Sequence, residues 1–319
     1  MKAAYYTTSG GPEVLTYGDV PDPIATNGHV LVRVQAISLE GGDVLGRRNT
    51  PPKHPPHVGG YAAAGVIEAA GPDVTGLEVG QRVACFNWQG SHAELFSVPA
   101  SFAFPVPDAL DIQAAAVGLI AFGTAHDALF EFGRLDENEK VLIQGAAGGV
   151  GLAALQLAHK AGATVIATAS SGERINRLRD FGADGGINYR QEDVGSRARE
   201  LTDGVGVDMV VDLAGGAAQS LLRALRYRGR LIAVGGASGS GASFSFGEIV
   251  PESLTVSGLF FGKELYTKRV HRMIAEIYGD MAAGRISMPV DRIFPLSEAA
   301  AAHRHAERGH PFGRIVLLP

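Results

Sequence analysis

Cysteine is almost absent from this chain, and so are the marks of several protein classes. The single cysteine, Cys85, excludes an intramolecular disulfide framework and a zinc site made of four cysteines. This scarcity predicts a reducing, cytoplasmic compartment. No apolar run approaches the roughly 18 residues of a membrane-spanning helix, and the first residues lack the apolar segment of a signal peptide. We therefore expect neither a membrane span nor a secretion signal.

Strong charge of one sign is also missing. The formal net charge is −5, and no block of lysine or arginine stands out along the 319 residues. Nucleic acid and membranes are therefore not expected partners. The chain is instead rich in hydrophobic residues, which make up 46% of the sequence. That content suffices for a large core, and the length predicts two domains.

One stretch organises the rest. A short apolar run, Val141 to Ile143, is followed by glycines and then by leucines at helical spacing, which predicts a strand, a turn and a helix. The spacing Ala146-x-Gly148-x-x-Gly151 is the dinucleotide-binding fingerprint with alanine at its first position. Glycine permits the tight turn, the approach of a pyrophosphate and close packing of helix on strand. A glycine-rich turn without a ligand is the alternative, and the surrounding strand–helix–strand order disfavours it.

The chain divides near residue 112 into two regions with different sequence patterns. Residues 1 to about 112 alternate short β-rich runs with turn clusters, which predicts a compact, barrel-like β domain with an irregular loop at 51–56. From residue 111 onward, helices alternate with strands, which predicts an α/β doubly wound parallel sheet. Helices are expected at 111–132, 149–162, 172–181, 192–202 and 216–227, strands at 141–145, 164–168, 186–189, 207–213, 229–234 and 254–259, and a loop at 235–253. Residues 263–319, with a helix, a second helix at 299–302 and a final strand at 313–317, are expected to rejoin the first domain.

The end of the second strand of this sheet bears on cofactor choice. An NAD site usually has an acidic residue there for the ribose hydroxyls. Here the strand is followed by Ser170 and Ser171, with Arg174 further on and no carboxylate at the strand end itself. Hydroxyl and guanidinium groups suit a 2′-phosphate, so we favour NADP(H). The alternative is that the serines only cap the next helix and Arg174 is solvated.

Several motifs resemble the medium-chain dehydrogenase/reductase superfamily, and more narrowly its zinc-independent quinone oxidoreductase branch. They are Ala146-Ala147-Gly148-Gly149-Val150-Gly151, Phe181-Gly182-Ala183-Asp184 with Asn188-Tyr189, and Gly313-Arg314-Ile315-Val316. The resemblance covers nearly the whole chain. It implies a GroES-like β-rich catalytic domain at 1–112 completed by 263–319, and a Rossmann domain at 113–262, with NADPH in a cleft between them. It also implies hydride transfer to a quinone, enone or similar acceptor, and a homodimer joined at the sheet edge around Leu254–Leu259.

The resemblance assigns cofactor contacts residue by residue. Gly149 and Val150, beside Ala147 and Gly148, match positions that meet the pyrophosphate, and Arg314 matches a basic residue that reaches the phosphates. Ser170, Ser171, Arg174 and Tyr189 are expected around the 2′-phosphate. Thr124 matches a threonine near the nicotinamide, while Ala214, Gly235, Phe260, Phe261 and Gly262 match strand ends that line the cofactor.

Zinc-dependent relatives supply the main rival interpretation, an alcohol dehydrogenase. Their ligand positions hold Glu40, then Tyr61 within Gly60-Tyr61-Ala62, and the apolar pair Leu119–Ile120 in this chain. A catalytic zinc needs three His, Cys or carboxylate ligands, and only Glu40 qualifies, so no metal is expected. The quinone oxidoreductase branch commonly has asparagine where Glu40 stands. Glu40 either bonds the nicotinamide ribose or a substrate oxygen, or it is a structural loop carboxylate.

The catalytic candidates follow from the chemistry of carbonyl reduction. Hydride transfer belongs to the cofactor, and a donor near the acceptor oxygen lowers the barrier. Tyr61 is the candidate donor by position, although its ring can instead only pack against the pocket wall. Phe86 and Trp88 either sandwich a planar acceptor or pack at the rim, and Cys85 is expected to be a small buried hydrophobe. A non-catalytic NADPH-binding protein remains a third possibility, and turnover with an acceptor distinguishes it.

Overall fold

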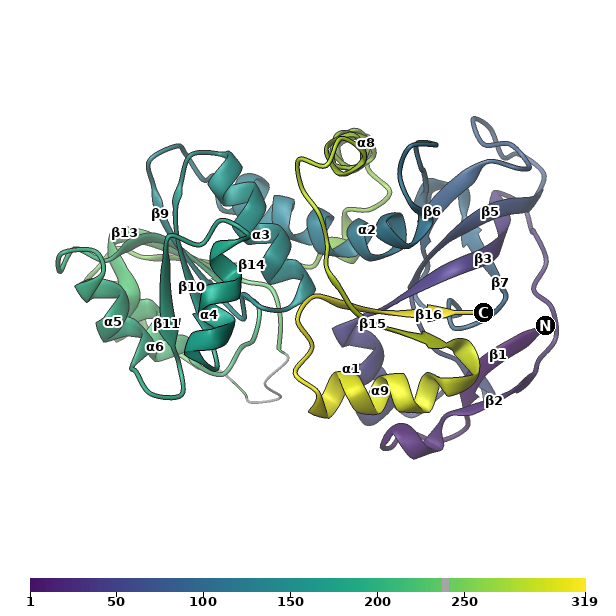
Figure 1. Cartoon of the computed structure of the whole chain (residues 1–319), viewed down its shortest axis with the longest axis horizontal. Coiled ribbons are helices and arrows are strands. Elements are labelled where there is room, and N and C mark those ends of the chain that lie inside the picture. The colour runs from purple at the N-terminus through teal and green to yellow at the C-terminus, as the bar shows by residue number, and fades with distance from the viewer. Residues whose placement is uncertain (237–240, 242) are drawn as a thin grey trace. The chain divides into compact units, whose positions relative to one another are not determined.

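The chain forms two compact units in a computed structural model that describes residues 1–236, 241 and 243–319. Unit 1 comprises residues 1–120 with 263–319, and unit 2 comprises residues 121–262 (Figure 1). The sequence placed the boundary before residue 113, but helix α2 (Ile112–His126) runs through that point without interruption. A division inside a continuous helix leaves no turn or composition change for the sequence to reveal.

Unit 1 is built around β3, the longest of its strands, because three other strands pair with it. β16 and β5 flank β3, and β7 pairs with its first half, all antiparallel. The larger sheet has the order β15-β16-β3-β5-β6-β8, and the smaller one has the order β2-β1-β4. The strands are β1 (Lys2–Tyr6), β2 (Thr16–Asp19), β3 (His29–Leu39), β4 (His57–Val58), β5 (Ala62–Ala70), β6 (Arg82–Phe86), β7 (Leu95–Pro99), β8 (Ala103–Pro105), β15 (Val290–Pro295) and β16 (Arg314–Leu318). The predicted β-rich domain and the return of the C-terminal strand to it are confirmed.

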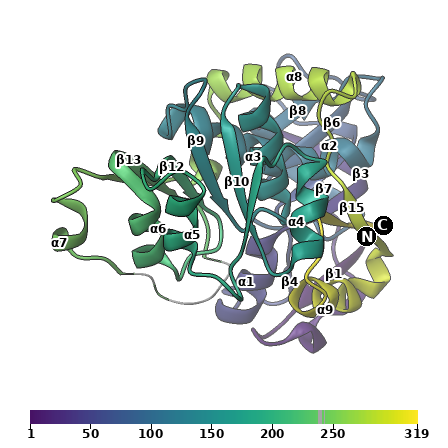
Figure 2. The ribbon, with the colours of Figure 1, turned by 60° about the vertical axis from the view of Figure 1, so that its left-hand side comes forward.

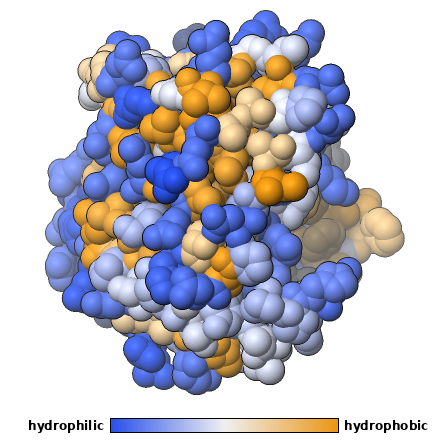
Figure 3. Space-filling view, turned by 90° about the vertical axis from the view of Figure 1, so that its right-hand side faces the viewer, coloured by the Kyte–Doolittle hydropathy of each residue, from blue (hydrophilic) through white to orange (hydrophobic). Residues whose placement is uncertain are grey.

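Helices complete unit 1 and contribute to its hydrophobic core. They are α1 (Gly41–Asn49), α8 (Lys268–Ala282) and α9 (Ala299–Arg308), and α1 and α9 lie side by side below β15 and β16 in Figure 1. Buried side chains of β3, β5, β6, β7 and β16 form the core with those of α9. On the face shown in Figure 3, hydrophobic side chains gather in the upper half among hydrophilic ones. Such mixing is ordinary for a protein surface and identifies no interface.

Unit 2 is the predicted doubly wound sheet, and its six strands are all parallel. Their order is β11-β10-β9-β12-β13-β14. The strands are β9 (Lys140–Gln144), β10 (Thr164–Ala169), β11 (Gly185–Asn188), β12 (Val207–Asp212), β13 (Leu225–Ala233) and β14 (Thr255–Gly258). The helices are α3 (Gly149–Lys160), α4 (Gly172–Arg179), α5 (Val194–Glu200), α6 (Ala218–Ala224) and α7 (Phe246–Ile249). Figure 2 shows α3 and α4 beside β9 and β10, and α5 and α6 beside β12 and β13.

Two expectations about the elements need correction. Helix α6 ends at Ala224, before the expected 227, because β13 already begins at Leu225 and pairs with β12 there. The expected loop at 235–253 contains the one-turn helix α7, and its residues 237–240 and 242 lie outside the described part of the chain. Helix Ile112–Phe132 is long and apolar enough to cross a membrane by composition, although no uninterrupted apolar run marks it. Because 72% of its most apolar window is buried, we interpret it as a core helix.

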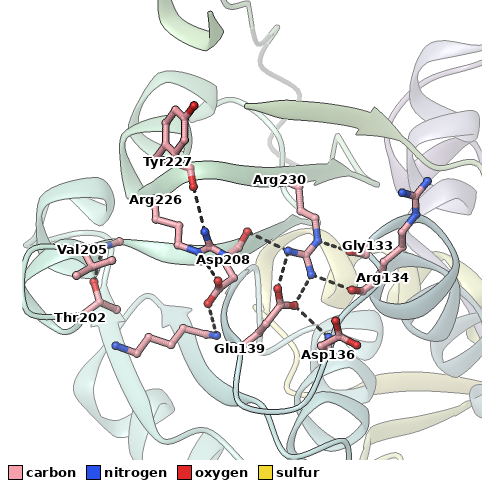
Figure 4. Close-up of polar contacts among 12 residues, drawn as sticks. Gly133, Arg134, Asp136, Glu139, Thr202, Val205, Asp208, Arg226, Tyr227 and Arg230 are labelled. Carbon is pink, nitrogen blue, oxygen red and sulfur yellow. Dashed lines mark hydrogen bonds and ion pairs between the residues drawn. The ribbon is translucent and has the colours of Figure 1, made fainter. Parts of the chain in front are cut away.

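Opposite the carboxyl ends of the parallel strands, Arg230 ties the amino-terminal edge of unit 2 together. Its guanidinium pairs with Glu139, just before β9, and donates to the carbonyl of Arg134 at 3.0 Å and to that of Gly133 (Figure 4). Its Nη1 also lies 3.4 Å from the carbonyl oxygen of Asp208 in β12. The Arg230 and Glu139 side chains are only 17% and 18% exposed. A single cation therefore links β13 to β9, β12 and the end of the 127–132 helix.

We predict that Arg230→Met lowers the free energy of unfolding by about 3 kcal/mol, because it leaves Glu139 and three carbonyl groups without this donor. Arg197→Met is the control, since its pairs with Glu192 and Glu200 lie at the surface, and it should change stability by less than about 1 kcal/mol. Urea unfolding measures both. Equal effects of the two substitutions would show that the Arg230 linkage contributes no more than a surface ion pair.

Candidate functional site

The carboxyl ends of the six parallel strands of unit 2 share one edge, and the chain reverses direction across the sheet between β9 and β12. The chain runs from β9 to β10 and β11 on one side, and then to β12, β13 and β14 on the other. Adjacent loops diverge at such a reversal, and they leave the crevice in which open α/β sheets bind ligands. The fingerprint turn between β9 and α3 lies at this position.

The turn has the geometry that the fingerprint requires. Gly145 follows β9 with φ +80°, a conformation that favours glycine, and its N–H donates to Thr168 Oγ1 at 3.2 Å. A Cβ on Gly151 would lie 2.5 Å from the carbonyl oxygen of Gly145, so only glycine lets α3 pack this closely on β9. Gly148 caps α3 without a side chain, which leaves the N–H groups of the first turn to face a ligand. The turn therefore fits a diphosphate.

The other expected cofactor residues of unit 2 also lie at or just beyond strand ends. Ala147 is in the turn, Ala214 and Gly235 follow β12 and β13, and Phe260 to Gly262 follow β14, while Thr124 is buried within α2. The sequence missed Asp212, which shapes this region. Its Oδ1 accepts from the N–H groups of Ala214 and Gly215 at 3.1 and 2.9 Å, and burial raises its pKa. An aspartate followed by glycines three and four residues later is a turn signal that was available in the sequence.

The residues expected to meet a 2′-phosphate follow β10 and β11, two adjacent strands. Ser171 is the N-cap of α4, and its hydroxyl accepts from the N–H of Arg174 at 3.3 Å, as the capping alternative predicted. Tyr189 follows β11, its N–H donates to the carbonyl of Ala169 at 3.2 Å, and its side chain is 43% exposed. Ser170 and Arg174 are partly exposed on the same edge. The Ser171 hydroxyl is occupied by its capping hydrogen bond to α4. Ser170 lies one residue before this N-cap.

In unit 1, Glu40 and Arg314 form a buried ion pair. Arg314 Nη1 lies 2.5 Å from Glu40 Oε2, and the Ser38 hydroxyl donates to Oε1 at 2.7 Å. Burial raises the pKa of the Glu40 carboxyl, while Arg314 and Ser38 act against that rise. Within the described part of the chain, Nε and Nη2 of Arg314 are buried and have no hydrogen-bond partner. Arg314 is thus held by Glu40 on one side and keeps two donors on the other.

Tyr61 precedes β5, and its side chain lies against the first turn of α1, next to this ion pair. A Cβ on Gly42 would lie 3.0 Å from the Tyr61 hydroxyl, so glycine makes room for the phenol there. Burial raises the pKa of Tyr61 well above its usual value, and the carboxylates of Glu40 and Asp43 add to the rise. The phenol therefore stays protonated through the neutral range and can donate a hydrogen bond.

The aromatic residues beside Tyr61 correct one expectation. Phe86 is buried, and its ring meets those of Tyr61 and Trp88 edge to face at centroid distances of 5.8 and 5.0 Å. Phe86 and Trp88 touch each other at 79°, so no planar molecule fits between them as a sandwich. Trp88 is 55% exposed. Cys85 is fully buried, and its pKa is raised by burial, as expected of a small hydrophobe.

Behind α1 lies a buried polar cluster that the sequence did not reveal. We call Asp43, Arg47, His92, His303 and Glu307 the histidine cluster. Arg47 Nε donates to His303 Nδ1 at 3.3 Å, and its other nitrogens contact the carbonyl of Gly10 and the carboxylate of Glu307. Burial, followed by the neighbouring His92 and Arg47, lowers the pKa of His303 well below its usual value. No spacing in the sequence points to this cluster, because Arg47 and His303 are 256 positions apart.

The donor set of unit 1 does not fit a catalytic zinc. Of the three ligand positions, Glu40 is engaged by Arg314 and Ser38, Tyr61 holds a neutral phenol, and Leu119 and Ile120 are buried and apolar. Among residues 1–236, 241 and 243–319, no group of three or more His, Cys, Asp or Glu side chains is placed to hold a metal ion. We therefore assign no metal to these three positions.

Comparison with known proteins covers both units. The alcohol dehydrogenase GroES-like domain family matches residues 26–108, and the zinc-binding dehydrogenase family matches residues 149–277. A 2-haloacrylate reductase of a Burkholderia species is 34% identical, and a quinone oxidoreductase of Pseudomonas aeruginosa is 33% identical, each over 100% of this chain and 99% of the relative. The Escherichia coli quinone oxidoreductase complexed with NADPH superimposes with a TM-score of 0.95 at 27% identity, over 100% of both chains.

We predict that His303 makes stability depend on pH below neutrality. The folded protein keeps this imidazole neutral, whereas the unfolded chain takes up a proton below about pH 6.5, so stability falls as the pH drops through that value. The loss attributable to His303 should approach about 1.4 kcal/mol per pH unit. His303→Asn keeps an acceptor for Arg47 and should flatten the slope of unfolding free energy between about pH 7 and 5.5.

Urea unfolding at several pH values measures this slope. His54→Asn, which replaces an exposed loop histidine, is the control for losing an imidazole. An unchanged slope in His303→Asn would show that other groups govern the acid sensitivity.

Proposed function

Because the chain belongs to the medium-chain dehydrogenase/reductase superfamily, in its quinone oxidoreductase branch, we propose that it transfers hydride from NADPH to a quinone or an α,β-unsaturated carbonyl compound. The chain is an oxidoreductase of that superfamily, and its relatives include reductases named for quinones and for a 2-haloacrylate. The observation that carries the proposal is a fingerprint turn that fits a diphosphate, in a chain whose zinc-ligand positions hold an engaged glutamate, a neutral phenol and apolar residues.

The cofactor contacts of the proposal follow the geometry of each unit. Bound NADPH supplies the hydride, and the protein supplies position and polarity. The N–H groups of Gly149 and Val150 hold the diphosphate at the start of α3, and Ser170, Arg174 and Tyr189 hold the 2′-phosphate. Thr124, Ala147, Ala214, Gly235 and Phe260 to Gly262 line the cofactor. Nε and Nη2 of Arg314, which have no hydrogen-bond partner in the described part of the chain, suit an anionic group, and we assign them to a cofactor phosphate.

Tyr61 is the proposed donor to the acceptor oxygen. When hydride reaches a conjugated carbonyl, negative charge develops on that oxygen, and a hydrogen bond there lowers the barrier. The raised pKa of Tyr61 keeps its proton in place at neutral pH, which a donor needs. Glu40 holds Arg314 in place with one oxygen and accepts from Ser38 with the other, so its role is to orient. Trp88 forms one exposed wall of the acceptor pocket.

We also propose a homodimer joined at the edge of the unit 2 sheet. Strand β14 lies at the end of the strand order, and an unpaired edge strand is a template for another strand. Tyr227 of β13 and Phe246 and Val250 of the segment that leads into β14 are 59%, 81% and 66% exposed. A molar mass of two chains by light scattering is the observation that this proposal requires. The cytoplasmic location expected from a single, reduced cysteine belongs to the same proposal.

The test of the function is NADPH oxidation by the purified protein with a panel of quinones, enones and 2-haloacrylate. We expect turnover without added zinc, and Tyr61→Phe should lower kcat by about a hundredfold because the acceptor oxygen loses its donor. NADPH binding without turnover on any acceptor would instead identify a non-catalytic binding protein. Alcohol oxidation that requires zinc would identify an alcohol dehydrogenase and overturn the proposal.

Cofactor preference gives a second test. Arg174→Ala should weaken NADPH binding by roughly ten- to hundredfold, because a charge-assisted hydrogen bond to the 2′-phosphate is lost, and leave NADH binding within about twofold. Arg179→Ala removes an exposed arginine from the same helix and serves as the control for net charge. Titration calorimetry measures all four affinities. An equal loss for NADPH and NADH would place Arg174 away from the 2′-phosphate.

A further inference from the structure

The histidine cluster ends at the first turn of α1, which carries Glu40. Arg47, His92 and His303 are each only 1% exposed. The cluster joins parts of the chain that are distant in sequence, because Asp43 and Arg47 belong to α1, His92 precedes β7, and His303 and Glu307 belong to α9. Its outer end is closed by Arg47, whose three guanidinium nitrogens contact His303, Gly10 and Glu307. Its inner end is Asp43.

Asp43 connects the cluster to Glu40 through the backbone. Its Oδ2 accepts from the N–H of Glu40 at 2.9 Å, and its own N–H donates to the carbonyl of Glu40 at 3.1 Å. This reciprocal pair fixes the backbone from which the Glu40 side chain extends. The Glu40 carboxylate then holds Arg314, so a shift of Asp43 would move the buried ion pair with it.

His92 is the group that restrains Asp43 from behind. Its Nε2 lies 3.6 Å from Asp43 Oδ2, and its ring meets that of His303 at a centroid distance of 5.4 Å. A Cβ on Gly60 would lie 2.8 Å from His92 Nε2, so glycine at that position makes space for the ring. The 3.6 Å gap exceeds a hydrogen bond, so His92 acts on Asp43 through a longer polar contact and packing.

The polarity of this cluster is costly, which argues against a purely structural role. Within the described residues, Asp43 Oδ1, Ser91 Oγ, both ring nitrogens of His92 and His303 Nε2 are buried without a protein hydrogen-bond partner. A buried polar atom left unsatisfied costs about 1–3 kcal/mol, and well-packed apolar residues are often at least as stable as buried polar groups. We therefore interpret these buried polar groups as holding the neighbouring residues in a particular geometry.

We propose that His92 is a positioning residue for hydride transfer, acting through Asp43 on the turn that carries Glu40. The role rests on the proposed function, because Glu40 and Arg314 matter to the reaction only if NADPH is bound beside them. The coupling runs from His92 to Asp43 by a polar contact and packing, from Asp43 to the Glu40 backbone by hydrogen bonds, and from Glu40 to Arg314 by an ion pair. Tyr61 lies at the same turn, next to Gly42, and depends on the same restraint.

The test compares two amides that differ by one methylene group. His92→Asn is too short to reach Asp43, whereas His92→Gln places an N–H donor near the position of Nε2. We expect His92→Asn to lower kcat about tenfold and to raise the KM for NADPH, because Arg314 would no longer be held beside the cofactor phosphate, and His92→Gln to recover most of both effects. Loss of packing alone would lower the melting temperature in both variants and leave kcat per folded molecule unchanged.

A double-mutant cycle identifies the route. If His92 acts through Asp43, then Asp43→Asn and the double variant His92→Asn/Asp43→Asn should show the same tenfold loss, because the second change removes nothing further. Losses that multiply to about a hundredfold would overturn the coupling. His303→Asn is the matched control, since it alters an equally buried neighbour that bonds Arg47, and its kcat should stay within about twofold.

The outcomes separate this inference from the function on which it rests. Wild-type protein without turnover on any acceptor would overturn both. Wild-type turnover together with unchanged kcat in His92→Asn would overturn the positioning role alone. If His92→Asn does not fold, the cycle is run with His92→Leu, which fills a similar volume without a polar atom, and Asp43→Asn, and effects that multiply would overturn the proposal.

Discussion

The close approach of α3 to the end of β9 is the constraint on which the candidate cofactor site depends. Gly151 meets the backbone of Gly145 and Ala146 so closely that a methyl group there would overlap them. This contact directs the first turn of α3 toward the edge of the sheet where the strand order reverses. The free N–H groups of that turn and the positive end of the helix dipole then point to one place. A diphosphate needs little else to be held.

Unit 1, by contrast, holds charged groups in its interior. Glu40 and Arg314 are stable there because each neutralises the other and Ser38 supplies a further hydrogen bond. Tyr61, which precedes β5, lies against Gly42 of the same turn, and its proton is retained because burial and nearby carboxylates oppose its ionisation. A neutral donor and a fixed cation therefore occupy the region where zinc-dependent relatives hold a metal. The absence of suitable ligands follows from the identity of these side chains.

The fold was largely predictable from the sequence, since most of the parallel strands contain a short apolar run and most of the connecting helices follow a turn signal. The elements that were mispredicted are short or end early. Helix α7 forms within a segment rich in glycine and serine, and helix α6 ends at Ala224 because β13 begins at Leu225. The site was predictable only in part. Ser171 proved to be a helix cap, and Phe86 packs edge to face against Trp88, because local chemistry does not show which neighbour a side chain meets.

The sequence by itself determined the strand–turn–helix at residues 141–151, the parallel sheet around it and the lack of zinc ligands. These follow from local periodicity, glycine spacing and residue type, which are properties of neighbouring positions. Only the tertiary structure decided that Arg314 pairs with Glu40 and that Asp43, His92 and His303 share one buried cluster. Residues as far apart as Arg47 and His303 meet because α1 and α9 pack together, and no local pattern encodes such a meeting.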